Sequence, residues 1–228
     1  MRDDWDQRAR ENARYYVATE KNLWSDEEFF GSGEITMQEQ ILNDLENVCQ
    51  GRDPKQMRVL EIGCGAGRVT RALARFFGEV YAVDISREMV RRARRALRDS
   101  PNARVIRNNG KDLSAVRGRW WHRFGFGPRV QFDFAFSCIV FQHIPSREII
   151  ENYVREVNRA LRPGGLFKFQ VQGYGEVEAH PEDSWVGVPF TEDDSREMAQ
   201  RCGFEMRFHH GSGGQDYWLW LFKTREIT

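Results

Sequence analysis

The feature that most limits the possible folds of this chain is an apolar run that leads into three closely spaced glycines. Residues 59–62 form the run, and Gly63, Gly65 and Gly67 follow before Arg68 opens a helical pattern. Glycine lets the chain turn sharply and lets backbone approach a ligand where a Cβ atom would intrude, and the amides at a helix start face such a ligand. The segment predicts a buried strand, a ligand-binding turn and a helix.

Short strand-like runs alternate with helical patterns over the middle of the chain. Buried strands are predicted at residues 57–62, 80–83, 104–106, 132–137 and 166–171. Helices are expected at residues 68–77, 87–98 and 146–161, the last ended by Arg162-Pro163-Gly164-Gly165. Strands that alternate with helices indicate a parallel sheet.

The carboxyl-terminal part of the chain has a different order of elements. A helix over about residues 191–202 leads to two strands at 204–209 and 217–222, joined by a glycine-rich turn at 210–214. Because the link is short, it allows only an antiparallel pair.

Helical patterns also precede the sheet. Apolar residues recur at helical spacing over residues 4–17, and a second helix is marked by the apolar residues from Ile35 to Val48 and ends near Gly51. Between them we expect a loop that is rich in aromatic residues and contains Gly31-Ser32-Gly33. The expected organisation is an amino-terminal helical cap at residues 1–52 and one core domain at 53–228.

Charge and cysteine content limit the function classes. The chain has 228 residues, with 34 Lys and Arg balanced by 34 Asp and Glu, so its net charge gives no reason to expect a nucleic acid or an anionic membrane as main partner. The four scattered cysteines show neither metal-ligand spacing nor a disulfide framework. A charged amino terminus and the lack of long apolar runs favour a cytoplasmic protein without a membrane span.

The segment from Glu61 to Gly67 resembles the first motif of the class I S-adenosylmethionine-dependent methyltransferases, an acidic residue followed by GxGxG. Asp84 ends the second predicted strand seventeen positions after Gly67, where the family carries a second acid. The resemblance covers residues 57–171 by motif. It implies S-adenosyl-L-methionine as the cofactor and a doubly wound α/β fold. The implied sheet is seven-stranded and mostly parallel, of order 3-2-1-4-5-7-6, with the last strand antiparallel.

The resemblance also implies a set of cofactor-binding residues. Asp84 would accept hydrogen bonds from the ribose hydroxyls, Ile85 would cover one adenine face, and Asp112 with Leu113 would meet the adenine edge. An Asp in such a loop is also commonly a turn former or helix cap, so Asp112 keeps that alternative. The full implied set is Glu61, Gly63, Cys64, Gly65, Gly67, Asp84, Ile85, Asp112, Leu113 and Ser137.

Two polar residues just past the fourth predicted strand are candidates for catalysis. His143 has the pKa range that suits a general base near neutrality, and Gln142 can position a ligand. The alternative is that His143 bonds backbone and fixes the loop before Pro145. Metal ligands are not expected at this site.

Aromatic and polar residues from several segments are candidates for the acceptor pocket. In small-molecule members of the family, amino-terminal helices fold over the pocket and exclude water. The alternative is that the aromatic rings only attach the cap to the sheet. The candidate substrate residues are Tyr15, Tyr16, Trp24, Phe30, Gln172 and Tyr174.

Two further features admit more than one interpretation. The arginines of the helix at 87–98 are interpreted as a solvated face, with nucleic-acid binding as the alternative. The segment from Trp120 to Phe126 departs from the family and is either a partner surface, a substrate wall or a hairpin packed on its own sheet.

The resulting hypothesis is an enzyme that methylates an oxygen, nitrogen or carbon of a small-molecule acceptor. A nucleic-acid acceptor and a membrane partner are not expected, and a homodimer remains an option. Two rivals belong to other classes. A nicotinamide-dependent oxidoreductase would carry GxGxxG, which this turn lacks. A non-catalytic S-adenosylmethionine-binding or scaffold protein would keep the glycines and use the Trp120 to Phe126 segment for a partner.

Overall fold

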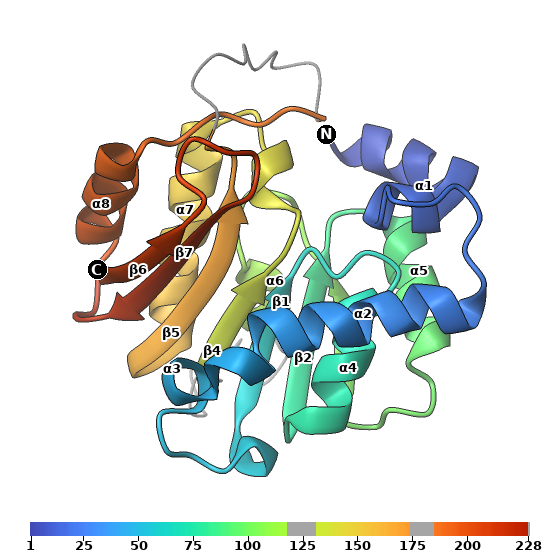
Figure 1. Cartoon of the computed structure of the whole chain (residues 1–228), viewed down its shortest axis with the longest axis horizontal. Helices are drawn as coiled ribbons and strands as arrows, with labels where there is room; N and C mark the ends of the chain where they lie inside the picture. The colour runs from blue at the N-terminus through green and yellow to red at the C-terminus, as the bar shows by residue number, and fades with distance from the viewer. Residues whose placement is uncertain (118–130, 174–184, 228) are drawn as a thin grey trace. The chain divides into compact units, whose positions relative to one another are not determined.

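A computed structural model describes residues 1–117, 131–173 and 185–227 of the chain (Figure 1). Within these residues the strands form a seven-stranded sheet of order β3-β2-β1-β4-β5-β7-β6. This confirms the strand order and fold class expected from the sequence. The chain divides into two compact units, Arg2–Gly110 and Lys111–Thr228, with Met1 grouped with the second.

The unit Arg2–Gly110 contains three parallel strands, which are β1 (Arg58–Ile62), β2 (Glu79–Asp84) and β3 (Ala103–Arg107). From the second residue on, β1 and β2 are buried along their length, and apart from the acids Glu61 and Asp84 these buried residues are apolar. Each strand lies within a residue or two of its predicted bounds, but β3 was wrongly expected to be buried: it lies at the edge of the sheet, and only Val105 in it is buried.

Two helices connect these strands. The first is α4 (Arg68–Phe76), and the second is α5 (Arg87–Ala96), which begins after the N-cap Ser86. The apolar side of α5 packs on the strands in a buried cluster of Cys64, Ala82, Val90, Ala93, Leu97 and Val105. The arginines at its other face are mostly exposed, as the amphipathic pattern predicted.

The first helix of the unit, α1 (Arg2–Val17), is broken at Asn12, whose φ of −158° and ψ of 83° are not helical. The Asn12 side-chain oxygen accepts a hydrogen bond from the backbone amide of Tyr15 (3.2 Å), so Asn12 caps the second half of the helix. The sequence predicted one continuous helix here, because a single Asn does not interrupt the apolar periodicity on either side of it.

The aromatic loop predicted between the first two helices is, from Asp26 on, not a loop but part of a helix. Gly31-Ser32-Gly33 lies inside α2 (Asp26–Gln40), which starts at a capping box made by Ser25 and Glu28. A Cβ atom on Gly33 would stand 2.2 Å from the carbonyl oxygen of Arg68. This glycine therefore allows α2 to pack closely along α4 (Figure 1).

Short helices complete the segment that follows α2. They are η1 (Leu42–Asp44), α3 (Leu45–Cys49) and η2 (Pro54–Gln56). The predicted second helix is thus divided into several pieces, although its end near Gly51 is confirmed.

In the unit Lys111–Thr228, the part of the chain that the structure describes forms the strands β4 (Phe132–Ser137), β5 (Leu161–Val171), β6 (Phe204–His210) and β7 (Tyr217–Lys223). β4 and β5 are parallel, and β7 runs antiparallel to both β5 and β6. The predicted antiparallel last strand is confirmed. β5 starts five residues earlier than predicted, because Leu161 already pairs with Phe132 before a register shift at the Pro-Gly-Gly turn.

The described residues of this unit also contain the helical segments α6 (Ser114–Arg117), η4 (Phe141–His143), α7 (Arg147–Ala160) and α8 (Glu192–Arg201). An aromatic core joins α7 to β5, where Phe141 lies 5.7 Å from Tyr153 and 5.0 Å from Phe169 between ring centroids. Lys223 is buried at the end of α7 and donates to the carbonyl oxygens of Asn158 (2.6 Å) and Leu161 (2.7 Å). These bonds satisfy carbonyls that a helix end leaves unpaired.

Across the described ranges, the helices are all too short or too polar to cross a lipid bilayer.

Candidate functional site

The glycine turn after β1 folds back over the end of β2. The amides of Gly63 and Cys64 both donate to the carbonyl oxygen of Val83, at 2.8 and 3.0 Å. Gly63, Gly65 and Gly67 have φ values of +77°, +52° and +89°, in the left-handed region that favours glycine. The GxGxG spacing is therefore required by the backbone path of the turn.

Asp84, at the end of β2, is joined to this turn. One carboxylate oxygen accepts a hydrogen bond from the Gly65 amide and the other from the Ser86 amide, both at 2.8 Å. Burial raises the pKa of Asp84 to about 6, and the hydrogen bonds from the two backbone amides partly oppose this rise. A carboxylate has about four lone-pair sites. The two amides occupy two of them and leave acceptor capacity for a ligand that lies on the turn.

A second carboxylate lies under the turn. Glu61 on β1 is 4% exposed, and its Oε2 has no hydrogen-bond partner. Burial raises the pKa of Glu61 to about 7. A buried polar atom without a partner is unusual in a folded protein and is explained when a ligand or water supplies the partner.

Cys64 and Ile85 flank these two acids. The buried Cys64 thiol lies 3.7 Å from the carbonyl oxygen of Gly65, and burial raises the pKa of this thiol. Ile85 is half-buried immediately after Asp84. The structure thus brings together in one unit seven of the predicted cofactor residues, namely Glu61, Gly63, Cys64, Gly65, Gly67, Asp84 and Ile85.

The end of α1 lies against the glycine turn. A Cβ atom on Gly65 would stand 2.6 Å from Cγ2 of Val17, so the last residue of α1 packs directly on this glycine. Near the other end of the helix, Asp6 accepts hydrogen bonds from the Ser86 hydroxyl (2.5 Å) and the Glu88 amide (3.1 Å). Two separate contacts therefore tie α1 to the segment that holds Asp84.

The aromatic residues of the cap have different environments. Tyr15 and Tyr16 are half-buried and pack edge to face, with 5.2 Å between ring centroids. Trp24 donates from its indole nitrogen to the Ala18 carbonyl (3.0 Å) and packs on Phe29. Trp24 and Phe30 belong to a cluster with buried Ala9, Ala13, Phe29, Ala66 and Met89. This packing supports their attaching role, and their predicted contact with an acceptor stays a prediction.

Three predicted cofactor residues belong to the unit Lys111–Thr228. The Asp112 carboxylate accepts a hydrogen bond from the Ser114 amide (2.8 Å) at the start of α6, which is the cap-like role kept as its alternative. Leu113 and Ser137 are fully buried. The adenine contact of Asp112 remains a prediction.

His143 and Gln142 lie in η4, just after β4, and are almost fully buried. His143 Nδ1 lies 2.5 Å from the carbonyl oxygen of Trp185, with the two rings 5.2 Å apart. This contact fits the predicted structural alternative for His143. Gln142 has a side-chain oxygen without a hydrogen-bond partner, so its amide remains a candidate for contacting a ligand.

The segment from Trp185 to Phe190, which we call the strap, packs beside these two residues and was not predicted. The amides of Gly187 and Val188 donate to the carbonyl oxygens of Gln142 (2.7 Å) and Ile144 (3.2 Å). The amide of Phe190 donates to the carbonyl oxygen of Gln172 (2.8 Å). The strap thus joins predicted catalytic and substrate residues.

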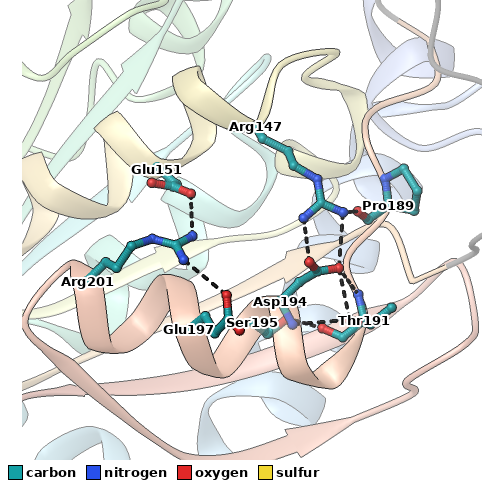
Figure 2. A network of polar contacts seen from close by, with 8 residues as sticks. All are labelled: Arg147, Glu151, Pro189, Thr191, Asp194, Ser195, Glu197 and Arg201. Carbon is teal, nitrogen blue, oxygen red and sulfur yellow. Dashed lines mark hydrogen bonds and ion pairs between the residues drawn. The ribbon is translucent and has the colours of Figure 1, made fainter.

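Figure 2 shows the polar contacts that hold the end of the strap. Arg147 at the start of α7 donates to the Pro189 carbonyl (2.6 Å) and pairs with Asp194 of α8 (2.7 Å). Thr191 and Asp194 form a capping box. A second bridge joins Arg201 to Glu151 at 2.7 Å. The sequence predicted a helix that starts near Thr191, but neither the capping box nor the partner of Arg147 was predicted.

Two sequence predictions fall outside the described residues. They are the substrate role of Tyr174 and the alternatives for the segment from Trp120 to Phe126.

Comparisons with known proteins agree with the motifs. Residues 59–165 match the model of a family described as a methyltransferase domain. The chain is 33% identical over 114 residues to the biotin biosynthesis bifunctional protein BioCD of Bordetella avium (strain 197N), covering 49% of this chain and 21% of the relative. It is 29% identical over 123 residues to a ubiquinone biosynthesis O-methyltransferase of Xanthomonas axonopodis pv. citri (strain 306), covering 53% and 45%. The chain spans less than half the length of both curated relatives.

The fold also resembles that of a solved methyltransferase structure. The crystal structure of magnesium protoporphyrin IX methyltransferase (ChlM) from Synechocystis PCC 6803 with bound SAH superposes with a TM-score of 0.66 and 15% identity, covering 98% of both chains. At this identity the likeness shows the fold. The ordered motifs, the methyltransferase-domain model matched over residues 59–165 and the shared sheet order all agree with the class I S-adenosylmethionine-dependent methyltransferases.

Proposed function

We propose that this protein transfers the methyl group of S-adenosylmethionine to an oxygen, nitrogen or carbon of a small-molecule acceptor. The observation that carries the proposal is the bond between the Asp84 carboxylate and the Gly65 amide, which joins an acid at the end of β2 to a turn of three left-handed glycines. A nucleoside ligand needs both a bare backbone surface and an acceptor for its ribose hydroxyls.

The residues present fit this cofactor. The three glycines of the turn carry no Cβ atom, so their backbone can lie close to a ligand, and Asp84 is held by two backbone amides. The unsatisfied Oε2 of Glu61 lies on the adjoining strand. When bound, S-adenosylmethionine would supply an electrophilic methyl group on its sulfonium sulfur, which passes to the acceptor's nucleophilic atom as the C–S bond breaks and S-adenosylhomocysteine leaves.

The protein's own contribution is to hold the acceptor close to the methyl group and to remove a proton where the acceptor carries one. We propose His143 for this second task. The Nδ1 contact with the Trp185 carbonyl orients the ring, and in a neutral imidazole held this way Nε2 is the atom that would accept a proton. Gln142 would orient the acceptor through its side-chain amide.

We also propose that residues 1–52 act as a cap that excludes water from the reaction. The support is the direct packing of Val17 on Gly65 and the anchoring of Asp6 to the segment after Asp84. Tyr15 and Tyr16, which lie in the same half of α1 as Val17, are the proposed acceptor contacts of the cap.

The function is tested with the purified full chain and methyl-labelled S-adenosylmethionine. The dialysable metabolite fraction of a cell extract serves as acceptor pool, with mass-spectrometric detection of methylated products. We expect a labelled small molecule and S-adenosylhomocysteine in equal amounts. Cofactor binding without turnover in any pool would favour the non-catalytic alternative. Label found only in added RNA would contradict the small-molecule acceptor, and binding of NADH in place of S-adenosylhomocysteine would favour an oxidoreductase.

A further inference from the structure

A backbone outlier follows β4. Among the described residues other than glycine, only Gln50 and Ile139 have a positive φ. Gln50 is the left-handed C-cap of α3, an ordinary place for such a residue. Ile139 has a φ of +57°, and its branched Cβ makes this conformation unfavourable. The surrounding structure must therefore hold Ile139 in place.

The amide of Ile139 is held by a buried side chain. It donates to Oε1 of Gln170 on β5 at 3.0 Å, and Gln170 is only 2% exposed. The Nε2 group of Gln170 donates in turn to the carboxylate of Asp216, which precedes β7. Because both ends of the Gln170 amide are bonded, its orientation is fixed, and it presents an acceptor to Ile139.

The side chain that this arrangement presents is apolar and exposed. Ile139 is 37% exposed, whereas Phe141 two residues later is fully buried. Ile139 also lies just beyond the carboxyl end of β4, and ligands of open α/β sheets bind beyond the carboxyl ends of the strands. Strained residues of this kind concentrate at ligand-binding and active sites.

We propose that Ile139 is a specificity-determining residue that contacts the methyl acceptor through its apolar side chain, and that Gln170 is the positioning residue that keeps it in the left-handed conformation. This inference rests on the proposed function, because it concerns the acceptor side of the same reaction. Asparagine or glycine would adopt the same backbone with less strain. The branched apolar side chain is thus explained by a contact that those residues could not make.

The test compares four single variants and one double variant of the full chain with the wild type. Ile139→Gly removes both the strain and the side chain, and Ile139→Val keeps a branched apolar group. Gln170→Leu removes the acceptor of the Ile139 amide. Phe208→Ala is the matched control, since Phe208 is another large apolar residue of the same unit and is 49% exposed.

Each variant is assayed with the acceptor purified from the metabolite screen, and its affinity for S-adenosylhomocysteine is measured by calorimetry. Ile139→Gly should lower kcat/KM for the acceptor by about tenfold or more, mainly through KM, as expected for loss of an apolar pocket contact. Its affinity for S-adenosylhomocysteine should stay within about twofold, and its thermal midpoint should not fall. Ile139→Val should retain most activity, and Phe208→Ala should match the wild type.

Gln170→Leu should raise the acceptor KM and speed hydrogen exchange at the Ile139 amide. The double variant Ile139→Gly/Gln170→Leu should be no worse in kcat/KM than Ile139→Gly alone, because Gln170 acts through Ile139. Additive losses, an unchanged acceptor KM in Ile139→Gly, or an equal loss of S-adenosylhomocysteine binding would each overturn the inference while the proposed function stands. A wild-type chain that neither binds S-adenosylhomocysteine nor turns over would overturn both.

Discussion

The Asp84 carboxylate accepts a hydrogen bond from the backbone amide of Gly65, with 2.8 Å between Oδ2 and the nitrogen. Asp84 is the last residue of β2, and Gly65 lies in the turn that follows β1. The bond therefore fixes the glycine turn relative to the carboxylate at the end of β2. A ligand that bonds to Asp84 therefore lies against the turn.

Asp84→Asn should weaken the binding of S-adenosylmethionine by about 1.5 to 3 kcal/mol, or roughly ten- to a hundredfold, since charge-assisted hydrogen bonds to the ribose become neutral ones. Isothermal titration calorimetry measures the change. Asp99→Asn is the matched control, because the Asp99 side chain is 89% exposed, and its affinity should be that of the wild type. A loss below tenfold in Asp84→Asn would count against the ribose contact.

Gly65→Ala should both destabilise the chain and weaken cofactor binding. A left-handed conformation at a non-glycine residue costs about 1 to 2 kcal/mol, and the new Cβ would press on Val17 from 2.6 Å. The double variant Gly65→Ala/Val17→Ala should recover part of the lost free energy of unfolding, because it removes the clashing methyl group. Chemical denaturation measures this coupling. Equal stability of single and double variants would show that α1 does not rest on Gly65.

The folded chain should become less stable as the pH rises, because the buried carboxyl of Glu61 then loses its proton. Burial raises the pKa of Glu61 to about 7, above its ordinary value of 4.5, so the folded state binds more protons than the unfolded state between these values. Its stabilising contribution is complete below about pH 4.5 and is lost as the pH rises through about 7. Between about pH 5 and about pH 8, the range in which Glu61 loses its proton, the denaturation midpoint of Glu61→Gln should fall less than that of the wild type. Exposed Glu20→Gln should keep the wild-type pH profile.

The base and structural roles of His143 can be separated by two substitutions. His143→Ala removes both the proton acceptor and the bond to the Trp185 carbonyl, and kcat should fall by about a hundredfold or more with cofactor affinity nearly unchanged. His143→Asn has an amide that can still donate to that carbonyl but cannot act as a base. Full recovery of kcat in His143→Asn would assign His143 a purely structural role. Steady-state kinetics over a pH series provides the measurement.

Much of the fold is determined by local sequence. The strands at residues 57–62 and 80–83 are mainly buried and mainly apolar, and the glycines at 63, 65 and 67 adopt backbone angles that other residues avoid. Such signals lie within a few residues, so the sequence alone determined the order of the strands, the glycine turn after the first of them and, through its resemblance to a family, the sheet order.

Tertiary packing decided what depends on residues far apart in the chain. Gly33 looked like part of a loop, yet it lies within α2, and a glycine stands there because the Arg68 carbonyl of α4 leaves no room for a side chain. The contact between His143 and Trp185, and the bond that holds Ile139 to Gln170, join residues 42 and 31 positions apart. A local pattern carries no information about such partners, since the free energy of each contact exists only once the strands and helices have packed.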